Sequence, residues 1–514
     1  MTIETKGPAS ATPPVSGMAE LTLRGVILGG LITLVFTAAN VYLGLKIGLT
    51  FATSIPAAVI SMAVLRLFST GTILENNIVQ TIASAAGTLS AIIFVLPGLV
   101  IIGWWQGFPY WLSAFTIATG GILGVMYSVP LRRALVTGSD LPYPEGVAAA
   151  EVLKVGAGSR EGLEENKRGL AAIVASAVSA ATFSVVAKTK LIAEEAATFF
   201  PLGAGATSVS TSFSMALIGV GHLVGLSVGV AMFIGLLISW VGLVPYLTAP
   251  LPAGADLADL VGTAFRTKAR FIGAGTIGVA AIWTLLKILG PIVSGIRSAL
   301  AANAARKSGN AGLLDITERD LPIGIVAGTI VAALLPIGIL LWVFAQGGPI
   351  ALNPVPVIGL TLAYVLVAGI VIASVCGYMA GLIGASNSPI SGVGILAVLG
   401  ASLLLAAIYG SGGDEGQTQA LIAYALFTTA IVFGIATISN DNLQDLKTGQ
   451  LVGATPWKQQ LALVLGVIFG ALVIPPVLDL LNSAFGFAGA SGAGANALPA
   501  PQAALISALA KGGL

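Results

Sequence analysis

The charged residues of this 514-residue chain are confined to short stretches between long apolar runs. Only 9% of the residues are Asp, Glu, Lys or Arg, whereas 56% are apolar. A soluble domain carries about 25% charged residues, and about 20 apolar residues suffice to cross the hydrocarbon core of a bilayer. The charge pattern therefore predicts an all-α polytopic membrane protein whose solvent is the lipid bilayer.

Apolar windows of membrane-helix length recur along the whole chain. We place them at Leu23–Leu45, Phe51–Leu67, Ile78–Ile102, Tyr110–Val129, Leu170–Ala187, Val209–Leu247, Phe271–Leu289, Leu321–Phe344, Val357–Cys376, Ile390–Tyr409, Ala420–Ile438 and Leu461–Leu480. The window Val209–Leu247 is too long for one span and is expected to hold a short half-helix and a full helix. The sequence thus predicts about 12 or 13 transmembrane helices with broken or re-entrant segments.

The connecting segments divide the chain into regions and sides. The Pro/Ser/Thr-rich residues 1–20 are expected to be a disordered cytoplasmic N-terminus, residues 21–481 the transmembrane domain, and residues 482–514 a loop and the start of a truncated further segment. Basic residues accumulate in cytoplasmic loops. Arg132 and Arg133 therefore indicate the cytoplasmic side, whereas the uncharged loop 103–107 and Asp414 indicate the other side. We expect a multi-pass protein of the cell (inner) membrane.

Two stretches of the sequence echo one another. Tyr42–Gly48 leads to Pro56, and Tyr378–Gly384 leads to Pro389. Transporters are often built from repeated halves with broken helices at matching positions, although such matches also arise by chance in a chain rich in Gly, Ala and Leu. A repeat would have halves of about 21–320 and from 321 to 481 onward.

Polar side chains within apolar runs mark the first candidate segment. Glu75, Asn76 and Asn77 open an apolar helix, and Gln80 follows one turn later. Acids and amides are favoured at helix N-termini, where they satisfy free backbone donors. Polar groups at membrane depth also tend to face a bundle interior or a water-filled path. The segment is therefore either an interfacial cap or part of a vestibule.

The second candidate segment carries two prolines directly before an acid. Pro142 and Pro144 flank Tyr143 and force an extended approach to a short helix that begins near Glu145. Glu151 follows on this helix and can pair with Lys154 three residues later. The alternative is a plain cytoplasmic loop.

Two further segments lie in the second half of the chain. Asn387, Ser388 and Pro389 sit between two apolar windows and suit an unwound helix that faces a cavity, or else a tight turn. The stretch from Ser439 to Gly449 follows a span and contains amides and acids that either cap the next helix or line a pathway. The candidate residues of a substrate and proton pathway are Glu75, Asn76, Asn77, Gln80, Tyr143, Glu145, Glu151, Asn387, Ser388, Asn440, Asp441 and Asp445.

Taken together, these segments resemble the oligopeptide transporter family, which includes the yellow-stripe-like metal-chelate transporters. The matching stretches are Gly44–Gly48, Glu75–Gln80, Leu141–Leu153, Arg270–Gly278, Ser386–Val393 and Asn440–Pro456. The resemblance implies a secondary symporter that is driven by protons and moves small peptides or peptide-like conjugates inward. Family members are typically longer, which agrees with a truncated chain.

Proton coupling requires a carboxyl group whose proton affinity is tuned by partial burial. Glu145 is our first choice for this role, because it lies between a double-proline break and an apolar helix. Uptake of a siderophore-like metal chelate is an alternative, and an intramembrane enzyme or a channel is an alternative of another class. An enzyme is not expected, because His222 lacks a neighbouring nucleophile-elbow pattern. The sequence predicts no cofactor, no metal site and no nucleic-acid partner, and leaves the substrate and the oligomeric state open.

Overall fold

The computed structural model describes residues 18–68, 71–158, 195–213, 226–280, 315–346, 348–386, 390–410, 414–494 and 496–514. It also describes residue 388 and short pieces between 164 and 193, between 218 and 222, and between 282 and 297. The prediction for Asn387 lies outside the described residues.

The described elements follow one another along the chain as helices, with one pair of strands. They are α1 (Leu23–Ile47), α2 (Ser54–Leu65), α3 (Ile73–Leu89), η1 (Ser90–Phe94), α4 (Pro97–Ile101), α5 (Tyr110–Arg132), η2 (Arg133–Thr137), α6 (Pro144–Gly158), β1 (Glu195–Leu202), β2 (Gly205–Ser212), α9 (Leu226–Leu237), η3 (Ile238–Leu243), α10 (Val244–Thr248), α11 (Leu257–Ala264), η4 (Phe265–Ala269), η6 (Ile316–Glu318), α13 (Ile323–Phe344), η7 (Pro349–Leu352), α14 (Pro354–Ile383), α15 (Ile390–Tyr409), α16 (Glu415–Val452), α17 (Pro456–Phe485) and α18 (Pro501–Gly513).

The predicted all-α membrane fold is confirmed. Within the described ranges, nine helical segments are long and apolar enough to cross a membrane. Three of the expected windows, Leu170–Ala187, Val209–Leu247 and Phe271–Leu289, fall partly outside those ranges, so the expected 12 or 13 spans remain a prediction. The window Ile78–Ile102 is one continuous helical segment, Ile73–Ile101, in which the 3-10 turn η1 separates α3 from α4.

Three expectations about element type and length were wrong. The stretch from Val209 is not helical at its start, because β2 pairs antiparallel with β1 over residues 205–212. The window Phe51–Leu67 contains only the 12-residue helix α2, which is too short to cross a bilayer alone. Finally, residues 439–449 do not follow a span but continue it, since α16 runs for 38 residues to Val452.

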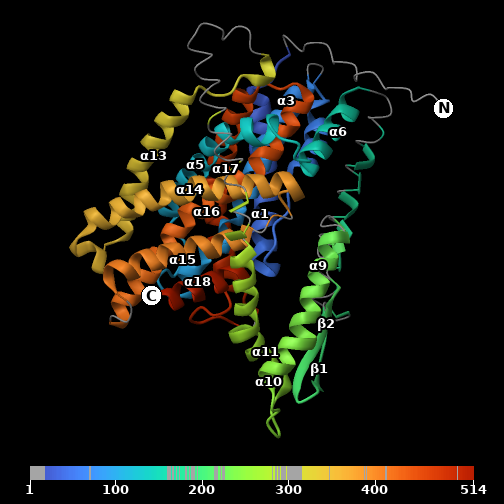
Figure 1. Ribbon diagram of the computed structural model, residues 1–514. Coiled ribbons are helices and arrows are strands. Elements are labelled where there is room, and N and C mark those ends of the chain that lie inside the picture. The colour runs from blue at the N-terminus through green and yellow to red at the C-terminus, as the bar shows by residue number, and fades with distance from the viewer. Residues whose placement is uncertain are drawn as a thin grey trace, which may run out of the picture.

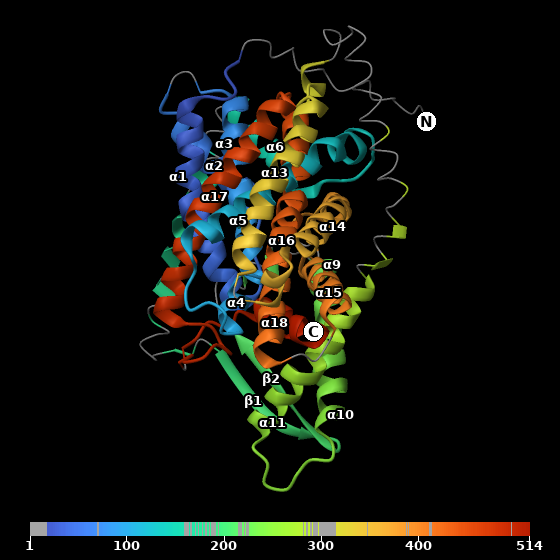
Figure 2. The ribbon, with the colours of Figure 1, turned by 90° about the vertical axis from the view of Figure 1, so that its left-hand side faces the viewer.

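The helix termini collect at two opposite ends of the bundle (Figure 1). At one end, which we call the basic end, Arg24 pairs with Glu75, Lys458 with Glu20, and Arg132 with Asp320. At the other end the amide of Gln419 donates to the carbonyl of Ile102, and Asn482 donates to Gln106. The predicted division of the loops between two sides is therefore reproduced in space. The strands and α10–α11 extend beyond this second end (Figure 2).

Helix α16 forms the centre of the bundle. Every residue from Ala420 to Leu446 is buried, and α3, α5, α14, α15 and α17 pack around the helix. Small residues permit this close packing. A methyl group on Gly120 of α5 would lie 2.6 Å from the carbonyl oxygen of Ile431, so only glycine allows the two backbones to approach this closely.

Candidate functional site

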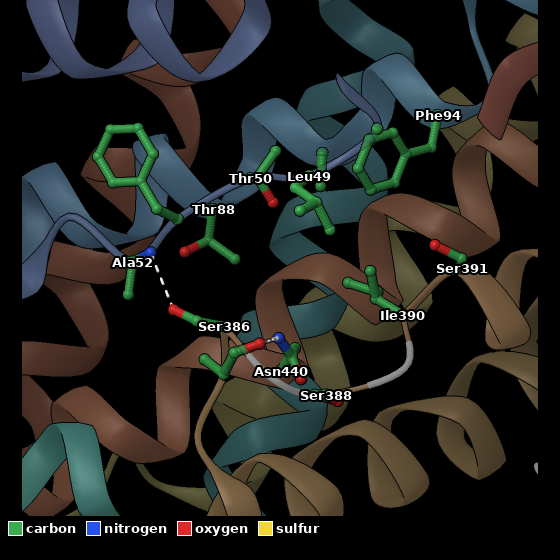
Figure 3. A pocket seen from close by; sticks show the side chains of 14 residues that line it. Leu49, Thr50, Ala52, Thr88, Phe94, Ser386, Ser388, Ile390, Ser391 and Asn440 are labelled. Atoms are coloured by element: carbon green, nitrogen blue, oxygen red, sulfur yellow. Dashed lines mark hydrogen bonds between the residues drawn. The ribbon is translucent and has the colours of Figure 1, made fainter. Parts of the chain in front are cut away.

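Two helix hairpins enter the bundle from opposite ends and meet in its interior. Helix α1 starts at the basic end, breaks at Gly48 (φ 77°), and α2 returns to that end. Helix α14 starts at the opposite end and breaks at Gly384 (φ 92°), after which α15 returns to that end. Both glycines adopt a backbone conformation that other residues rarely tolerate. The backbone amide of Ala52 donates to the hydroxyl of Ser386 at 3.2 Å and joins the two breaks (Figure 3).

A pocket of about 70 Å³ lies between the two breaks. Residues 48–52 form one wall, and residues 385, 386, 388, 390 and 391 form the other (Figure 3). Thr88 of α3, Ala91 and Phe94 of η1, and Asn440 of α16 complete the lining. The structure thus places predicted residues Ser388 and Asn440 at one site and adds Thr88, which sequence reasoning did not include.

Two asparagines hold the irregular backbone of the breaks. The Asn40 side chain accepts from the amide of Phe51 at 3.1 Å and donates to its carbonyl at 3.0 Å. Asn440 donates to the carbonyl of Ala385 at 2.9 Å. Its own oxygen, Oδ1, is buried and accepts no hydrogen bond from the described residues. A buried acceptor that lacks a donor can receive an N–H group of a ligand that reaches it.

The N-terminus of α15 borders this pocket, and that of α2 follows closely after it in the chain. Helix α2 begins two residues after Ala52, and the first residue of α15, Ile390, is itself part of the lining and donates its amide to the carbonyl of Ser388. The first turn of a helix carries a partial positive charge, because its N–H groups have no partner within that helix. The start of α15 therefore suits a carboxylate, and the buried Oδ1 of Asn440 is an unpaired acceptor within the described residues.

A stripe of hydrogen-bond donors on α3 faces two buried acids of α16. Ser84 and Thr88 donate to Asp441 Oδ2 at 2.5 and 2.7 Å, and Gln80 donates to Asp445. The other carboxyl oxygen of each aspartate accepts no hydrogen bond from the described groups. Gln80, Ser84 and Thr88 recur every four residues, which is the spacing of one helix face. That spacing could have extended the prediction from Gln80 to the two hydroxyl residues.

Glu145 lies against the break at Gly384, on the basic-end side of the pocket. We call the break at Gly48 the first break and the one at Gly384 the second break. Its Oε1 accepts from the backbone amide of Ser386 at 3.0 Å, while its Oε2 has no partner within the described structure. Burial raises the pKa of Glu145 above its ordinary value of 4.5, and nearby Asp441 raises it further. Tyr143, directly before this helix, has a positive φ of 45° and donates its backbone amide to Gly381 at 2.9 Å.

The remaining predicted residues lie elsewhere. Glu75 forms an ion pair with Arg24 at 2.6 Å at the basic end, and Asn76 accepts a hydrogen bond from Ser61 at 2.5 Å. Asn77 is buried one turn from Gln80, and neither polar atom of its amide has a partner in the described part of the chain. Glu151 is exposed and pairs with Lys154 at 3.0 Å. These contacts place Glu75 and Glu151 away from the pocket.

Histidine, cysteine and acidic side chains do not gather into a metal site in the described ranges, where no group of three or more could hold an ion. The single cysteine, Cys376, is buried in α14.

Opposed broken helices that meet at a pocket in the interior of a helical membrane bundle are typical of membrane transporters. Comparison with known proteins shows the family. The chain belongs to the OPT oligopeptide transporter protein family, whose sequence profile matches residues 20–514. The family resemblance inferred from the motifs is thereby confirmed, and the protein is a transporter and not an enzyme.

Individual relatives support this assignment. A Haemophilus influenzae protein, named as a candidate oligopeptide transporter, is 46% identical over 485 residues, which cover 92% of this chain and 75% of the relative. A rice (Oryza sativa) protein, named as a probable metal-nicotianamine transporter, is 22% identical over 94% of this chain and 70% of its own length. A rice iron-phytosiderophore transporter is 23% identical over 91% of this chain and 72% of its own length.

Proposed function

We propose that this protein carries small oligopeptides or peptide-like conjugates into the cell by proton-coupled symport. The observation that supports this most strongly is the pocket between the two breaks. The start of α15 suits the carboxylate of a peptide, and the free Oδ1 of Asn440 suits an amide or ammonium N–H. The name of the Haemophilus influenzae relative agrees with this substrate class.

The pocket in the present structure represents a closed state. Its volume of about 70 Å³ is well below the roughly 300–1,000 Å³ of a typical small-molecule site. A peptide therefore enters only after the two breaks move apart. The hydrogen bond from Ala52 to Ser386 crosses from one break to the other, so it must open when the substrate is admitted.

Glu145 remains our first choice for the coupling residue. As a carboxylate it accepts the hydrogen bond from Ser386 and holds the second break. A proton on this group weakens that acceptor, because the charged form binds donors more strongly. Asp441 and Asp445 lie nearby on α16 and supply two further groups that a proton can occupy along the pathway.

The distribution of charge supports an orientation. Arg24, Arg132, Arg133 and Lys458 all lie at the basic end. Under the positive-inside rule this end faces the cytoplasm. The N-terminus then lies in the cytoplasm, and we propose the cell (inner) membrane as the location.

Metal-chelate uptake is the second candidate substrate class. It is favoured by the names of the rice relatives, which refer to metal–nicotianamine and iron–phytosiderophore complexes. Such chelates carry carboxylates and amines as peptides do, so the same pocket groups could bind them.

Uptake into proteoliposomes tests the proposal. Di- to pentapeptides and metal–nicotianamine complexes are offered with and without an inward proton gradient, and a protonophore serves as the control. Gradient-driven accumulation of a peptide supports the proposal, and accumulation of the chelate alone favours the second candidate. Equilibration of solutes regardless of the gradient would instead indicate a channel.

A further inference from the structure

The loop before α18 repeats the double-proline loop before α6. The first reads Leu141-Pro142-Tyr143-Pro144-Glu145, and the second reads Leu498-Pro499-Ala500-Pro501-Gln502. Tyr143 (φ 45°) and Ala500 (φ 39°) are also the only residues other than glycine with positive φ in the described part of the chain. A positive φ is unusual for residues with a side chain, so its occurrence at matching positions of two similar loops indicates a common structure.

Each loop binds the broken helix of the other half of the chain. The amide of Tyr143 donates to Gly381, three residues before the break at Gly384. The amide of Ala500 donates to Leu45, three residues before the break at Gly48, at 2.8 Å. Side chains of the two loops also lie against the glycines. A methyl group on Gly384 would lie 2.8 Å from Glu145 Oε1, and one on Gly48 would lie 2.8 Å from the side chain of Pro501 and 3.6 Å from that of Gln502.

The surrounding helices follow the same correspondence with reversed direction. Helices α1 and α3 begin at the basic end, whereas α14 and α16 begin at the opposite end. Gly120 of α5 contacts the backbone of α16 at Ile431, and Gly466 of α17 contacts the backbone of α3 at Ile82 in the same manner. The pairs α1–α14, α2–α15, α3–α16, α5–α17 and α6–α18 therefore describe an inverted repeat.

We propose that the two loops are the two gates of the transporter, and that Gln502 is the positioning residue for the first break, as Glu145 is for the second. This inference rests on the proposed transport function. The Glu145 gate closes the pocket toward the basic end, and the Gln502 gate closes it toward the opposite end. Alternating access is then an exchange of the two loop contacts, of which the structure shows both closed.

The charged surroundings of the two gates differ. Around Glu145, α16 contributes the acids Asp441 and Asp445. Helices α2 and α14 contribute no charged side chain. The acid of α3, Glu75, is paired with Arg24. Tyr378 and Cys376 of α14 are the nearest neutral titratable groups on that helix. Around Gln502, Arg270 donates to the carbonyl of Pro501, α1 contributes Lys46, α18 contributes Lys511, and α4 and α15 contribute no charge. Among the described residues, only the first gate therefore holds a carboxyl group.

Sided labelling of a pocket cysteine tests the proposal without any substrate. Cys376, the single cysteine of the chain, is first replaced by alanine, and Thr50→Cys then serves as the reporter in the pocket. A membrane-impermeant maleimide is applied to oriented vesicles from either side. Glu145→Ala should raise labelling from the basic end, and Gln502→Ala should raise it from the opposite end, each by about twofold or more for the loss of one contact.

Controls on the same helices separate gating from general loosening. Glu151→Ala and Lys511→Ala remove exposed side chains of α6 and α18 and should leave both labelling rates unchanged. Glu145→Asp and Gln502→Asn shorten the gate side chains by one methylene and should shift labelling in the same directions if the alanine variants do not fold. In protein with both gates intact, acidification on the basic-end side should raise labelling from that side, as Glu145→Ala does. In the Glu145→Gln variant, acidification should leave the labelling rate unchanged.

Labelling that rises from the same side in both gate variants, or that does not change in either, would overturn the inference. That result would leave the transport function intact, because uptake in proteoliposomes is measured separately. Conversely, sided labelling with no uptake of any peptide or chelate would refute the proposed substrates and leave the gates in place.

Discussion

Ser386→Ala is expected to open the contact between the two breaks. The Ser386 hydroxyl accepts from the amide of Ala52 at 3.2 Å. The substitution removes this bond but leaves the backbone bond from Ser386 to Glu145, which holds the second break. The variant therefore separates the link between the breaks from the gate itself.

The magnitude follows from this bond. A typical intramolecular hydrogen bond contributes about 0.5–1.5 kcal/mol net, which corresponds to roughly a 2- to 13-fold change in the equilibrium between closed and open states. The lower part of the range is expected, because both Ala52 and Ser386 are only partly buried and water can replace the lost partners.

The assay is the labelling rate of a cysteine at position 50 in protein that lacks Cys376. Ser391→Ala is the matched control, because its hydroxyl lines the same pocket without joining the two breaks. We expect faster labelling for Ser386→Ala by at least about twofold and no change for Ser391→Ala. Equal labelling of the two variants would refute the argument that this hydroxyl holds the pocket closed.

Three further predictions concern stability. Arg24→Ala leaves the carboxyl group of Glu75 without its cation and should lower the melting temperature. Glu75→Gln in the same background should recover part of the loss, as measured in a thermal melt. Burial raises the pKa of Glu145 above 4.5, so the folded protein holds a proton that the unfolded chain has released. The wild type should therefore lose thermal stability relative to Glu145→Gln as the pH rises above 4.5. A difference between the two melting temperatures that does not change with pH would contradict this. Gly120→Val places a branched side chain against the carbonyl of Ile431 and should destabilise the bundle by roughly 1–3 kcal/mol, while Gly324→Val on the open face of α13 should not, as compared by denaturation in detergent.

The sequence predicted the segments of the site better than their geometry. The prolines around Tyr143 correctly indicated a break before a short helix, since proline restricts both its own backbone and that of its neighbour. The Asn-Asp-Asn stretch at 440–442 was misinterpreted as the end of a helix, because these residues favour caps in isolated peptides. In the folded protein, Ser84, Thr88 and Ala385 provide hydrogen-bond partners from distant parts of the chain, so the helix continues.

Long-range partners also decided what the sequence left open for Glu75. The cap and the vestibule were equally consistent with its position at a helix start. Glu75 forms an ion pair with Arg24, 51 residues earlier, and its backbone amide donates a hydrogen bond to the hydroxyl of Thr72. These contacts place Glu75 at a helix N-terminus at the basic end. Similarly, the echo between Tyr42–Gly48 and Tyr378–Gly384 was too short to establish a repeat. Its support comes from the Leu-Pro-x-Pro pattern that Tyr143 and Ala500 share, together with the backbone angles and contacts of these two residues.

The hydrogen bond from Ala52 to Ser386 has a consequence for biosynthesis. Its two residues are 334 positions apart, and at about 5–20 residues per second a ribosome needs roughly 20 to 70 seconds to make the intervening chain. During that time the polar backbone of residues 48–53 lacks both Ser386 and the loop at Ala500, and an unsatisfied backbone group is costly in lipid. The first hairpin to leave the ribosome is thus among the last parts of the protein to mature, and membrane insertases that shelter polar segments should associate with it until the second half arrives.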